Sequence, residues 1–373
     1  MKLYCITLFF LVISRIGFAQ KDQFTVTKNE WGKEGKEKIF LLDLQNPNGM
    51  HIQLTNYGAI LVRAEVPDRH NNFEDVVLGF DSLAQYQQPN PLFGATVGRF
   101  ANRIRNGAFE IDGVLYHLDT KGGKHSIHGG GEFSSALWKV EKTFKRKEEA
   151  GVVFSYFSKD GSHGFPGNVQ SKVTYTLTKN NEIKIDFEAK TDKDTHISMT
   201  NHSYFNLNGM KRSIVDQEIR IDANTITAID KDIVPTGQLE EVRNTEKDLT
   251  VQKPIGENIF KLANNGYHFC YVFNKEINKP KKVIEVVDPT SGRTLSVVTT
   301  QPSVQFYTGN SLDGSIIGKG GKAYGKHIAF CLETQHLPDT PNHPNFPSSM
   351  VKAGETYHET VIYQFGVDKQ LNN

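Results

Sequence analysis

The segment of residues 173–189, VTYTLTKNNEIKIDFEA, indicates the fold class of this chain most clearly. Apolar side chains occupy every second position in two runs, 173–177 and 183–189. A period of two is typical of strands with one buried face. Asn180-Asn181 lies between the runs and has the composition of a tight turn. The segment therefore predicts an antiparallel β-hairpin.

The same pattern recurs on both sides of this hairpin. Residues 295–299 and 361–365 alternate in the same way, and Asp112-Gly113 separates a run at 109–111 from one at 114–118. Lys and Glu are dense in residues 141–149, which predicts a solvated strand and hairpin tip. Repeated neighbouring hairpins of this kind are typical of an all-β protein.

Helical patterns are few and short. The better ones cover residues 81–87, with Asp81 as the cap, and residues 254–263, with Pro254 in the first turn. No break in composition, long linker or internal repeat divides residues 24–367. We therefore predict a single large antiparallel β-sandwich with a few short helices, covering residues 20–373.

The overall composition supports a globular protein. The chain has 373 residues, and its 43 Lys and Arg nearly balance its 42 Asp and Glu, which leaves a formal net charge of +1. A near-neutral chain is a poor partner for nucleic acid. Hydrophobic residues make up 38%, enough for a large core and far from the composition of disordered chains.

The first nineteen residues have the pattern of a cleavable secretory signal. Lys2 is followed by an uncharged, mostly apolar run, Leu3–Ser14, and Gly17-Phe18-Ala19 ends in the small residues that signal peptidase accepts. The run is too short for a membrane span, and an uncleaved anchor is the alternative. The pattern predicts a periplasmic or secreted protein.

Two cysteines, Cys270 and Cys331, remain after such cleavage. Two are too few for a disulfide framework or a structural zinc site. A single bridge between them is permitted in an oxidising compartment, and the sequence leaves their pairing open.

Glu333 is the first candidate for chemistry. In the segment of residues 329–335, the strand period puts Glu333 on one face with Cys331 and Gln335, while Phe330 and Leu332 take the other. Glu333 is either an ordinary solvent-facing carboxylate or a partly buried one that can abstract a proton.

His202 is the second candidate, because it shares a strand face with Thr200 and Tyr204. An imidazole there could donate a proton at neutral pH. The alternative is a hydrogen-bonded histidine of the core.

Six motifs occur in order along nearly the whole chain after the signal segment. They are Asn102-Arg103-Ile104, His128-Gly129-Gly130, Gly164-Phe165-Pro166-Gly167, Thr200 to Leu207, Gln301 to Asn310, and Cys331 to Gln335. With these motifs the chain resembles the aldose 1-epimerase (galactose mutarotase) family. The resemblance implies a galactose mutarotase-like β-sandwich that interconverts the α- and β-anomers of hexoses such as galactose and glucose, and that requires no cofactor.

The resemblance also implies roles for individual residues. Glu333 corresponds to the general base that takes the proton of the anomeric hydroxyl, and His202 to the general acid that protonates the ring oxygen. This chemistry asks for one acid and one base on opposite sides of the hemiacetal. The residues implied to bind substrate are Asn102, Arg103, His128 and Gln305.

One position departs from the family. Where the family usually has an Asp after Gly-Tyr or Gly-Phe, this chain has His268 after Gly266-Tyr267. A neutral imidazole can bind a sugar hydroxyl, but it offers no anionic acceptor. We expect His268 to contribute to substrate binding and to alter the sugar preference.

No protein metal site is predicted. His336 and His343 lie in a Pro-rich segment, and their spacing fits no regular zinc pattern. Calcium held by loop oxygens is an alternative. We expect a monosaccharide as the partner, and a monomer or weak dimer.

Two rival functions stay open from the sequence. A glycoside hydrolase would need two carboxylates flanking the scissile bond, and Glu333 is the one acid singled out here. A noncatalytic carbohydrate-binding protein is the second rival, which the missing family Asp favours.

Overall fold

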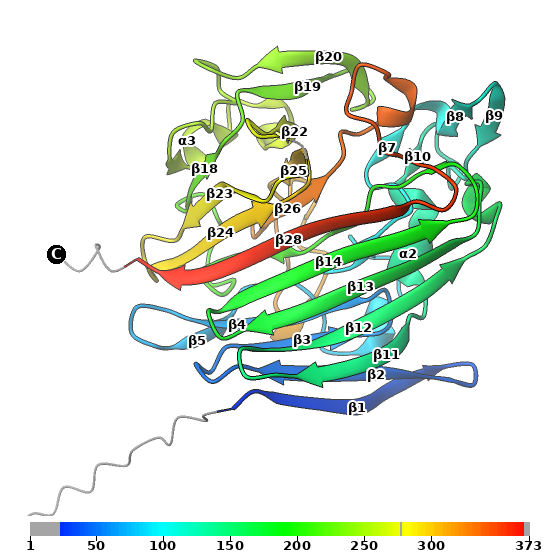
Figure 1. The fold of residues 1–373 in the computed structure, drawn as a ribbon. Coiled ribbons are helices and arrows are strands. Elements are labelled where there is room, and N and C mark those ends of the chain that lie inside the picture. The colour runs from blue at the N-terminus through cyan, green and yellow to red at the C-terminus, as the bar shows by residue number, and fades with distance from the viewer. Residues whose placement is uncertain (1–22, 277, 369–373) are drawn as a thin grey trace, which may run out of the picture.

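The computed structural model describes residues 23–276 and 278–368, and the predicted signal segment lies outside these ranges. Three antiparallel sheets make up most of the described chain (Figure 1). The nine-stranded sheet contains, in spatial order, β11 (Lys139–Lys145), β12 (Glu149–Ser158), β13 (Val169–Thr178), β14 (Glu182–Thr191), β28 (Thr356–Val367), β24 (Arg293–Thr299), β23 (Lys281–Val287), β18 (Glu218–Ile221) and β21 (Lys253–Pro254).

Two smaller sheets pack against the inner face of this large one. The five-stranded sheet contains β1 (Thr25–Glu34), β2 (Glu37–Gln45), β3 (His51–Thr55), β4 (Ile60–Pro67) and β5 (Phe73–Asp75). The six-stranded sheet contains β17 (Tyr204–Phe205), β26 (Phe330–Gln335), β25 (Ser303–Tyr307), β22 (His268–Val272), β19 (Thr225–Ile229) and β20 (Pro235–Glu241).

Short elements connect the sheets. The two-stranded pairs are β10 (Ser126–Ile127) with β7 (Arg103–Ile104), β15 (Thr195–His196) with β27 (Met350–Val351), β16 (Thr200–Asn201) with β6 (Thr96–Val97), and β8 (Ala108–Ile111) with β9 (Val114–His117). The helical elements are α1 (Leu83–Tyr86), α2 (Glu132–Ser135), α3 (Gly256–Ile259) and the 3₁₀ turns η1 (Arg105–Gly107), η2 (His128–Gly131), η3 (Ser162–Gly164), η4 (Ala263–Asn265), η5 (Lys319–Gly321) and η6 (Thr340–Asn342).

The predicted hairpins are confirmed. β13 and β14 pair around Asn180-Asn181, and β8 and β9 pair around Asp112-Gly113. Along β14 the buried residues alternate with partly exposed ones, as the period of two predicts. Residues 141–149 form the end of the β11–β12 hairpin.

The two predicted helices are shorter than expected. The first is confined to α1, and Asp81 lies before its N-cap residue, Ser82. The second is confined to α3, because Pro254 takes part in the sheet as the end of β21. In the second segment Gly256 and Asn258 have low helix propensity, so the chain does not favour a longer helix there although Ile255, Ile259 and Leu262 are buried.

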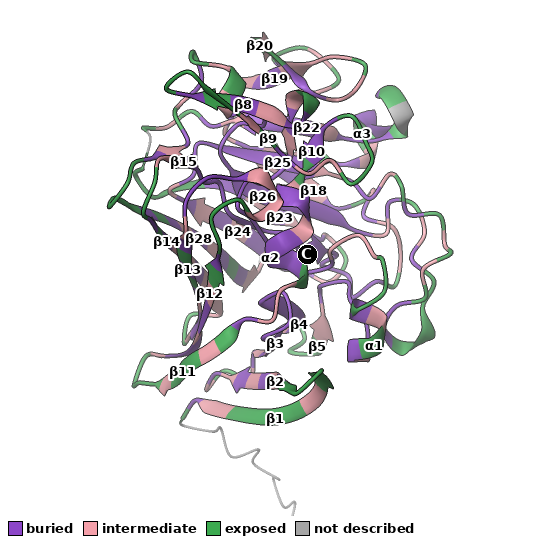
Figure 2. Ribbon diagram, turned by 90° about the vertical axis from the view of Figure 1, so that its right-hand side faces the viewer, coloured by how far each residue is buried: buried purple, intermediate pink, exposed green. Residues whose placement is uncertain are grey.

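The core lies between the large sheet and the two smaller ones. Phe187 of β14, Leu54 of β3 and Phe330 of β26 belong to one buried apolar cluster, which joins all three sheets into a sandwich. Figure 2 shows the strands of this interior buried and the edge strand β1 largely exposed. The predicted all-β sandwich class is confirmed.

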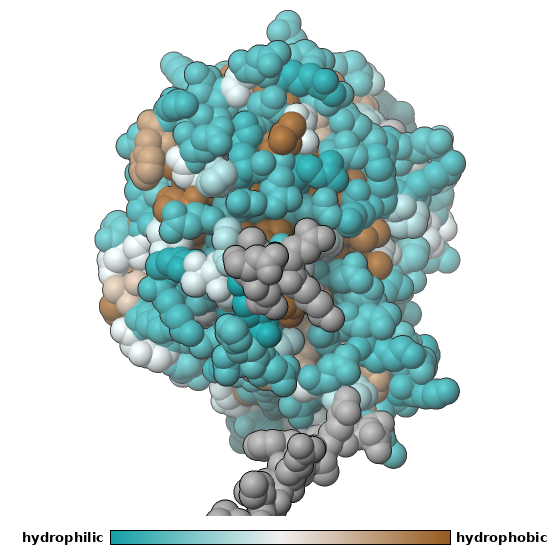
Figure 3. All heavy atoms as spheres, turned by 90° about the vertical axis from the view of Figure 1, so that its left-hand side faces the viewer, coloured by the Kyte–Doolittle hydropathy of each residue, from teal (hydrophilic) through white to brown (hydrophobic). Residues whose placement is uncertain are grey.

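The outer surface is mainly polar. The face in Figure 3 is hydrophilic over most of its area, with apolar residues in small separate groups. In the described part of the chain, no helix combines the length and the apolar character that a membrane crossing needs.

Candidate active site

Glu333 lies on β26, a strand whose six residues are all buried. Hydrogen bonding to β25 on one side and β17 on the other places β26 inside the six-stranded sheet. Phe330 and Leu332 face the central core, while Cys331 belongs to a different apolar cluster on the opposite face. The strand period was therefore predicted correctly, and Glu333 is a buried carboxylate with 3% exposure.

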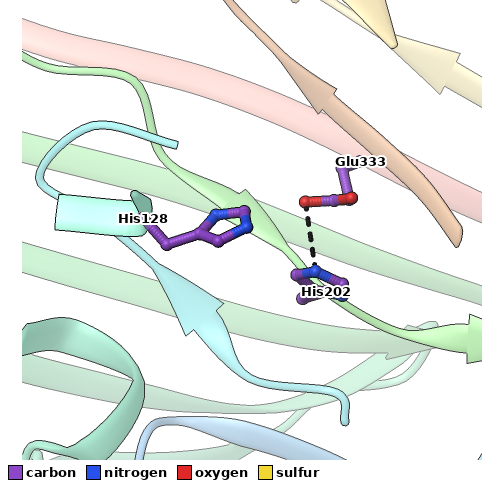
Figure 4. A group of neighbouring side chains, drawn as sticks. All are labelled: His128, His202 and Glu333. Atoms are coloured by element: carbon purple, nitrogen blue, oxygen red, sulfur yellow. Dashed lines mark ion pairs between the residues drawn. The ribbon is translucent and has the colours of Figure 1, made fainter. Parts of the chain in front are cut away.

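His202 lies between β16 and β17 and is held by its backbone. Its amide donates to the carbonyl of Ala95 at 2.8 Å, and its carbonyl accepts from the amide of Gly94 at 2.9 Å. The imidazole stacks on the ring of Tyr204, with centroids 5.2 Å apart and an angle of 16°. These contacts bring His202 Nε2 to 3.5 Å from Glu333 Oε2, so two residues 131 positions apart in sequence form one pair (Figure 4).

His128 approaches the pair from η2 (Figure 4). Its ring lies edge to face with that of His202, with centroids 5.3 Å apart. Two hydrogen bonds connect His128 to Asn102. The His128 backbone amide donates to the Asn102 carbonyl at 2.9 Å, and the Asn102 backbone amide donates to the ring nitrogen Nδ1 of His128 at 3.2 Å. Gly129 makes this approach possible, because a Cβ there would lie 2.3 Å from the carbonyl oxygen of Gly98.

Asn102 also connects the η2 region to the sheet. Its backbone has φ of 66°, in the left-handed region that Asn tolerates. Its side-chain amide donates to Gln305 Oε1 at 2.9 Å, and its side-chain oxygen accepts from the Arg103 amide at 2.9 Å. Gln305 in turn pairs in register with Glu333, so the predicted binding residues converge on the predicted base.

These residues border one cavity of about 390 Å³. A volume of this size suits a small polar ligand such as a monosaccharide. The residues that line it are Pro91, Leu92, Asn102, Arg103, Ile127, His128, His202, Tyr204, His268, Gln305, Tyr307, Ser311, Leu312, Asp313, Ser315, Ile316 and Glu333. All seven residues proposed from the sequence are therefore brought together.

Burial sets the proton affinities in this cavity. Desolvation raises the pKa of Glu333 to about 8, although the positive charge of Arg103 acts in the opposite direction. Desolvation lowers the pKa of His202 to about 4 and that of His128 well below its usual range. Between about pH 4 and pH 8, Glu333 and His202 together carry one exchangeable proton, which either group can hold.

His268 also lies on the cavity wall, at the position where the family Asp is missing. It pairs in register with Tyr307, and the two rings have centroids 5.0 Å apart. Burial, with smaller contributions from Arg103 and His202, lowers its pKa to about 4. His268 is therefore a neutral imidazole that can donate or accept one hydrogen bond.

Ligand type alone would allow a metal ion at His128, His202 and Glu333, since one ligand atom from each lies within 4.8 Å of the others. The hydrogen bond from the Asn102 amide to His128 Nδ1 argues against this use. A neutral imidazole that accepts at Nδ1 carries its proton on Nε2, so neither nitrogen of His128 offers a free lone pair. The arrangement suits hydrogen bonding to a ligand oxygen better than metal ligation.

The two cysteines left open by the sequence are both free thiols and both buried. The histidines of the Pro-rich segment have separate partners. His343 Nε2 lies 3.2 Å from an Asp339 oxygen, and His336 Nε2 lies 3.9 Å from a Glu359 oxygen.

The sequence argument missed one wall of the cavity. The loop of residues 311–316 directly follows the motif that ends at Asn310, and it contributes the acid Asp313. Tyr307 anchors this loop, because its hydroxyl donates to Ser311 Oγ at 2.9 Å. The sequence could have indicated this wall, because the predicted motif that ends at Asn310 continues directly into this loop, which contains Ser311, Asp313 and Ser315.

Comparisons with known proteins identify the family. A family model described as aldose 1-epimerase matches residues 41–364. A galactose mutarotase of Bos taurus is 41% identical over 322 residues, which cover 85% of this chain and 92% of the relative. An aldose 1-epimerase of Haemophilus influenzae is 37% identical over 332 residues, covering 87% and 95%.

A solved structure shows the same architecture. The crystal structure of an aldose epimerase homologue from C. elegans matches with a TM-score of 0.81 and 28% identity. The match covers 88% of this chain and 98% of that one.

Proposed function

The chain belongs to the aldose 1-epimerase family, and from this membership and the site geometry we propose that Glu333 and His202 interconvert the α- and β-anomers of a hexose. The enzyme is an isomerase that acts on sugars such as galactose and glucose. The observation that carries the proposed residue roles is the pairing of Glu333 Oε2 and His202 Nε2 at 3.5 Å beside a sugar-sized cavity.

The reaction needs two proton transfers, one at each of the two oxygens bonded to C1. Glu333 takes the proton of the hydroxyl on C1 while His202 gives a proton to the ring oxygen, and the bond between C1 and the ring oxygen breaks to leave an open-chain aldehyde. Rotation about the C1–C2 bond presents the other carbonyl face. Reclosure with both transfers reversed gives the opposite anomer and restores both side chains. The sequence argument placed the acid and the base on opposite sides of the hemiacetal, but the 3.5 Å between Glu333 and His202 leaves no room for a sugar between them. Because the two reacting oxygens share C1, an acid and a base held side by side can serve both.

The remaining residues provide hydroxyl recognition. The fork of donors on Arg103 suits vicinal hydroxyls, and the amides of Asn102 and Gln305 can donate and accept. His128 presents Nε2–H, because its Nδ1 is occupied by the Asn102 amide. We propose that this N–H donates to an oxygen near the sugar ring.

Polarimetry on purified protein tests the proposal. Fresh α-glucose, α-galactose and a panel of other aldoses should each be followed to anomeric equilibrium, with and without enzyme. Faster equilibration without release of new reducing sugar from glycosides supports mutarotation. Binding without faster equilibration would favour a noncatalytic carbohydrate-binding protein, and glycoside cleavage would favour a hydrolase.

The pH dependence should follow the shared proton. We expect kcat/KM to be highest between about pH 4 and pH 8, where Glu333 and His202 together hold one exchangeable proton. Below this window a second proton occupies the base, and above it the acid has no proton to give, so the rate should fall about tenfold per pH unit on each side. Polarimetry corrected for the uncatalysed reaction measures the profile. A rate that keeps rising above pH 9 would contradict the assignment.

Substitution of His268 should act mainly on binding. We expect His268→Asp to lower KM for galactose or glucose by roughly 5- to 30-fold with little change in kcat, because a carboxylate forms a charge-assisted bond with a hydroxyl. For an aldose to which the native pocket is fitted and which differs at this hydroxyl, the same substitution should raise KM. His268→Ala with unchanged KM for every aldose would place the side chain outside the binding contacts.

We further propose that the enzyme is exported, from the pattern of Lys2, Leu3–Ser14 and Ala19. Mass spectrometry of the protein from its native host should find an N-terminus at or close to Gln20. Intact Met1 in the mature pool would contradict export.

The proposed steps use side chains alone. Calcium on loop oxygens stays an alternative from the sequence, and metal analysis of the purified protein tests it.

We also propose a monomer or weak dimer, which sedimentation over a range of concentrations tests.

A further inference from the structure

Cys331 contacts the proposed general acid directly. Its sulfur lies 3.7 Å from His202 Nδ1, within the range of a hydrogen bond to sulfur. Cys331 is two residues before Glu333 on β26, and it pairs in register with Tyr204 on β17. The thiol therefore lies behind the imidazole, on the side away from Glu333.

The ring of His202 needs such a contact for its orientation. Stacking on Tyr204 fixes the plane of the imidazole, but the same stacking is retained when the ring turns over by 180°. Turning over would exchange nitrogen and carbon positions, and a carbon would then face Glu333. The contact at Nδ1 distinguishes the two orientations, because carbon forms no comparable bond with the thiol.

A thiol is suited to a residue that gains and loses a proton. It is a weak donor and a weak acceptor, so it can bond Nδ1 whether or not that nitrogen carries a proton. The Tyr204 side chain also interacts with this thiol. Burial raises the pKa of Cys331 well above its usual range, so the group stays a thiol.

We propose that Cys331 is a positioning residue for the isomerase: its thiol holds His202 by Nδ1 so that Nε2 faces Glu333 and the ring oxygen of the sugar. This inference rests on the proposed role of His202. A purely structural role for Cys331 would be filled by any side chain of similar size in this apolar cluster.

The test compares Cys331→Val, Cys331→Ser and the matched control Cys270→Val. Valine keeps nearly the same volume without a polar group, serine keeps a donor and acceptor of shorter reach, and Cys270 is a buried thiol whose sulfur contacts Ser303. We expect Cys331→Val to lower kcat about three- to tenfold, the range for loss of one neutral hydrogen bond, with KM within about twofold. Serine should recover part of the loss, and the control should leave kcat unchanged.

Nitrogen-15 NMR of histidine-labelled protein gives a readout that packing alone would not move. Without sugar, the Nδ1 shift of His202 should change in Cys331→Val and not in Cys270→Val. Unchanged shifts and unchanged kcat in a folded Cys331→Val would overturn the proposal. If Cys331→Val fails to fold, Cys331→Ala provides the same comparison.

The NMR arm is independent of mutarotation. A wild-type protein that equilibrates no aldose would refute the proposed function, while the change in the His202 shift would still decide the contact with Cys331. A wild-type protein that is active, with His202 shifts indifferent to Cys331, would refute the positioning role alone.

Discussion

Glu333→Gln is expected to lower kcat for mutarotation by at least about 10²-fold while the protein stays folded. The amide keeps the volume of the carboxyl group, and it cannot accept the proton of the anomeric hydroxyl. Oε2 of Glu333 is buried and accepts no hydrogen bond from the described residues, and His202 Nε2 at 3.5 Å is its ion-pair contact. The loss of this oxygen therefore removes no hydrogen bond of the folded structure.

Glu333→Gln should also change how the free energy of unfolding depends on pH. Because burial raises the pKa of Glu333 from 4.5 to about 8, the folded state binds this proton more tightly than the unfolded state does. The carboxyl group therefore lowers the free energy of unfolding progressively as pH rises from about 4.5 to 8. Glutamine carries no such charge, so Glu333→Gln should lose this decline in urea denaturation measured at pH 5 and pH 8.

A second buried glutamate provides the matched control. Glu359 on β28 is 5% exposed and its pKa is also raised by burial, but it does not line the cavity. Glu359→Gln should leave kcat close to that of the wild type. A near-normal rate in Glu333→Gln would remove Glu333 from the mechanism.

Local sequence patterns were sufficient for the strands but not for the depth of the site. The alternation in residues 183–189 predicted which side chains of β14 face the core, because a sandwich buries one face of each strand. In β26 the same alternation predicted the shared face of Cys331 and Glu333, but both faces of that strand are buried. Burial therefore depends on what covers the strand, which a local period does not contain.

The site itself depends on contacts between distant segments. Asn102 bonds Gln305 across 203 positions, and Glu333 meets His202 across 131. The family resemblance singled out these residues together, whereas each taken alone had an ordinary alternative. The loop of residues 311–316 carried no periodic pattern, and its place on the cavity wall follows from the anchoring of Ser311 by Tyr307.

His202→Asn is expected to lower kcat by at least about 10²-fold as well. The side-chain amide of Asn reaches about as far as Nδ1 of the imidazole, so contact with Cys331 can persist while the nitrogen that faces Glu333 is lost. The matched control is His196→Asn. His196 is another buried histidine whose pKa burial lowers to about 4, and its Nδ1 lies 2.9 Å from Ser349 Oγ, outside the cavity.

The double variant Glu333→Gln with His202→Asn tests whether the pair is one unit. Each proton transfer requires the other, because breaking the bond to the ring oxygen needs both the departure of the hydroxyl proton and the arrival of a proton on the ring. Once either group is removed the second has little left to contribute, so the double loss should be far smaller than the product of the single losses. Polarimetry on all four proteins measures this. A double loss equal to the product would mean that the two groups act in separate steps, and the shared-proton mechanism would then be wrong.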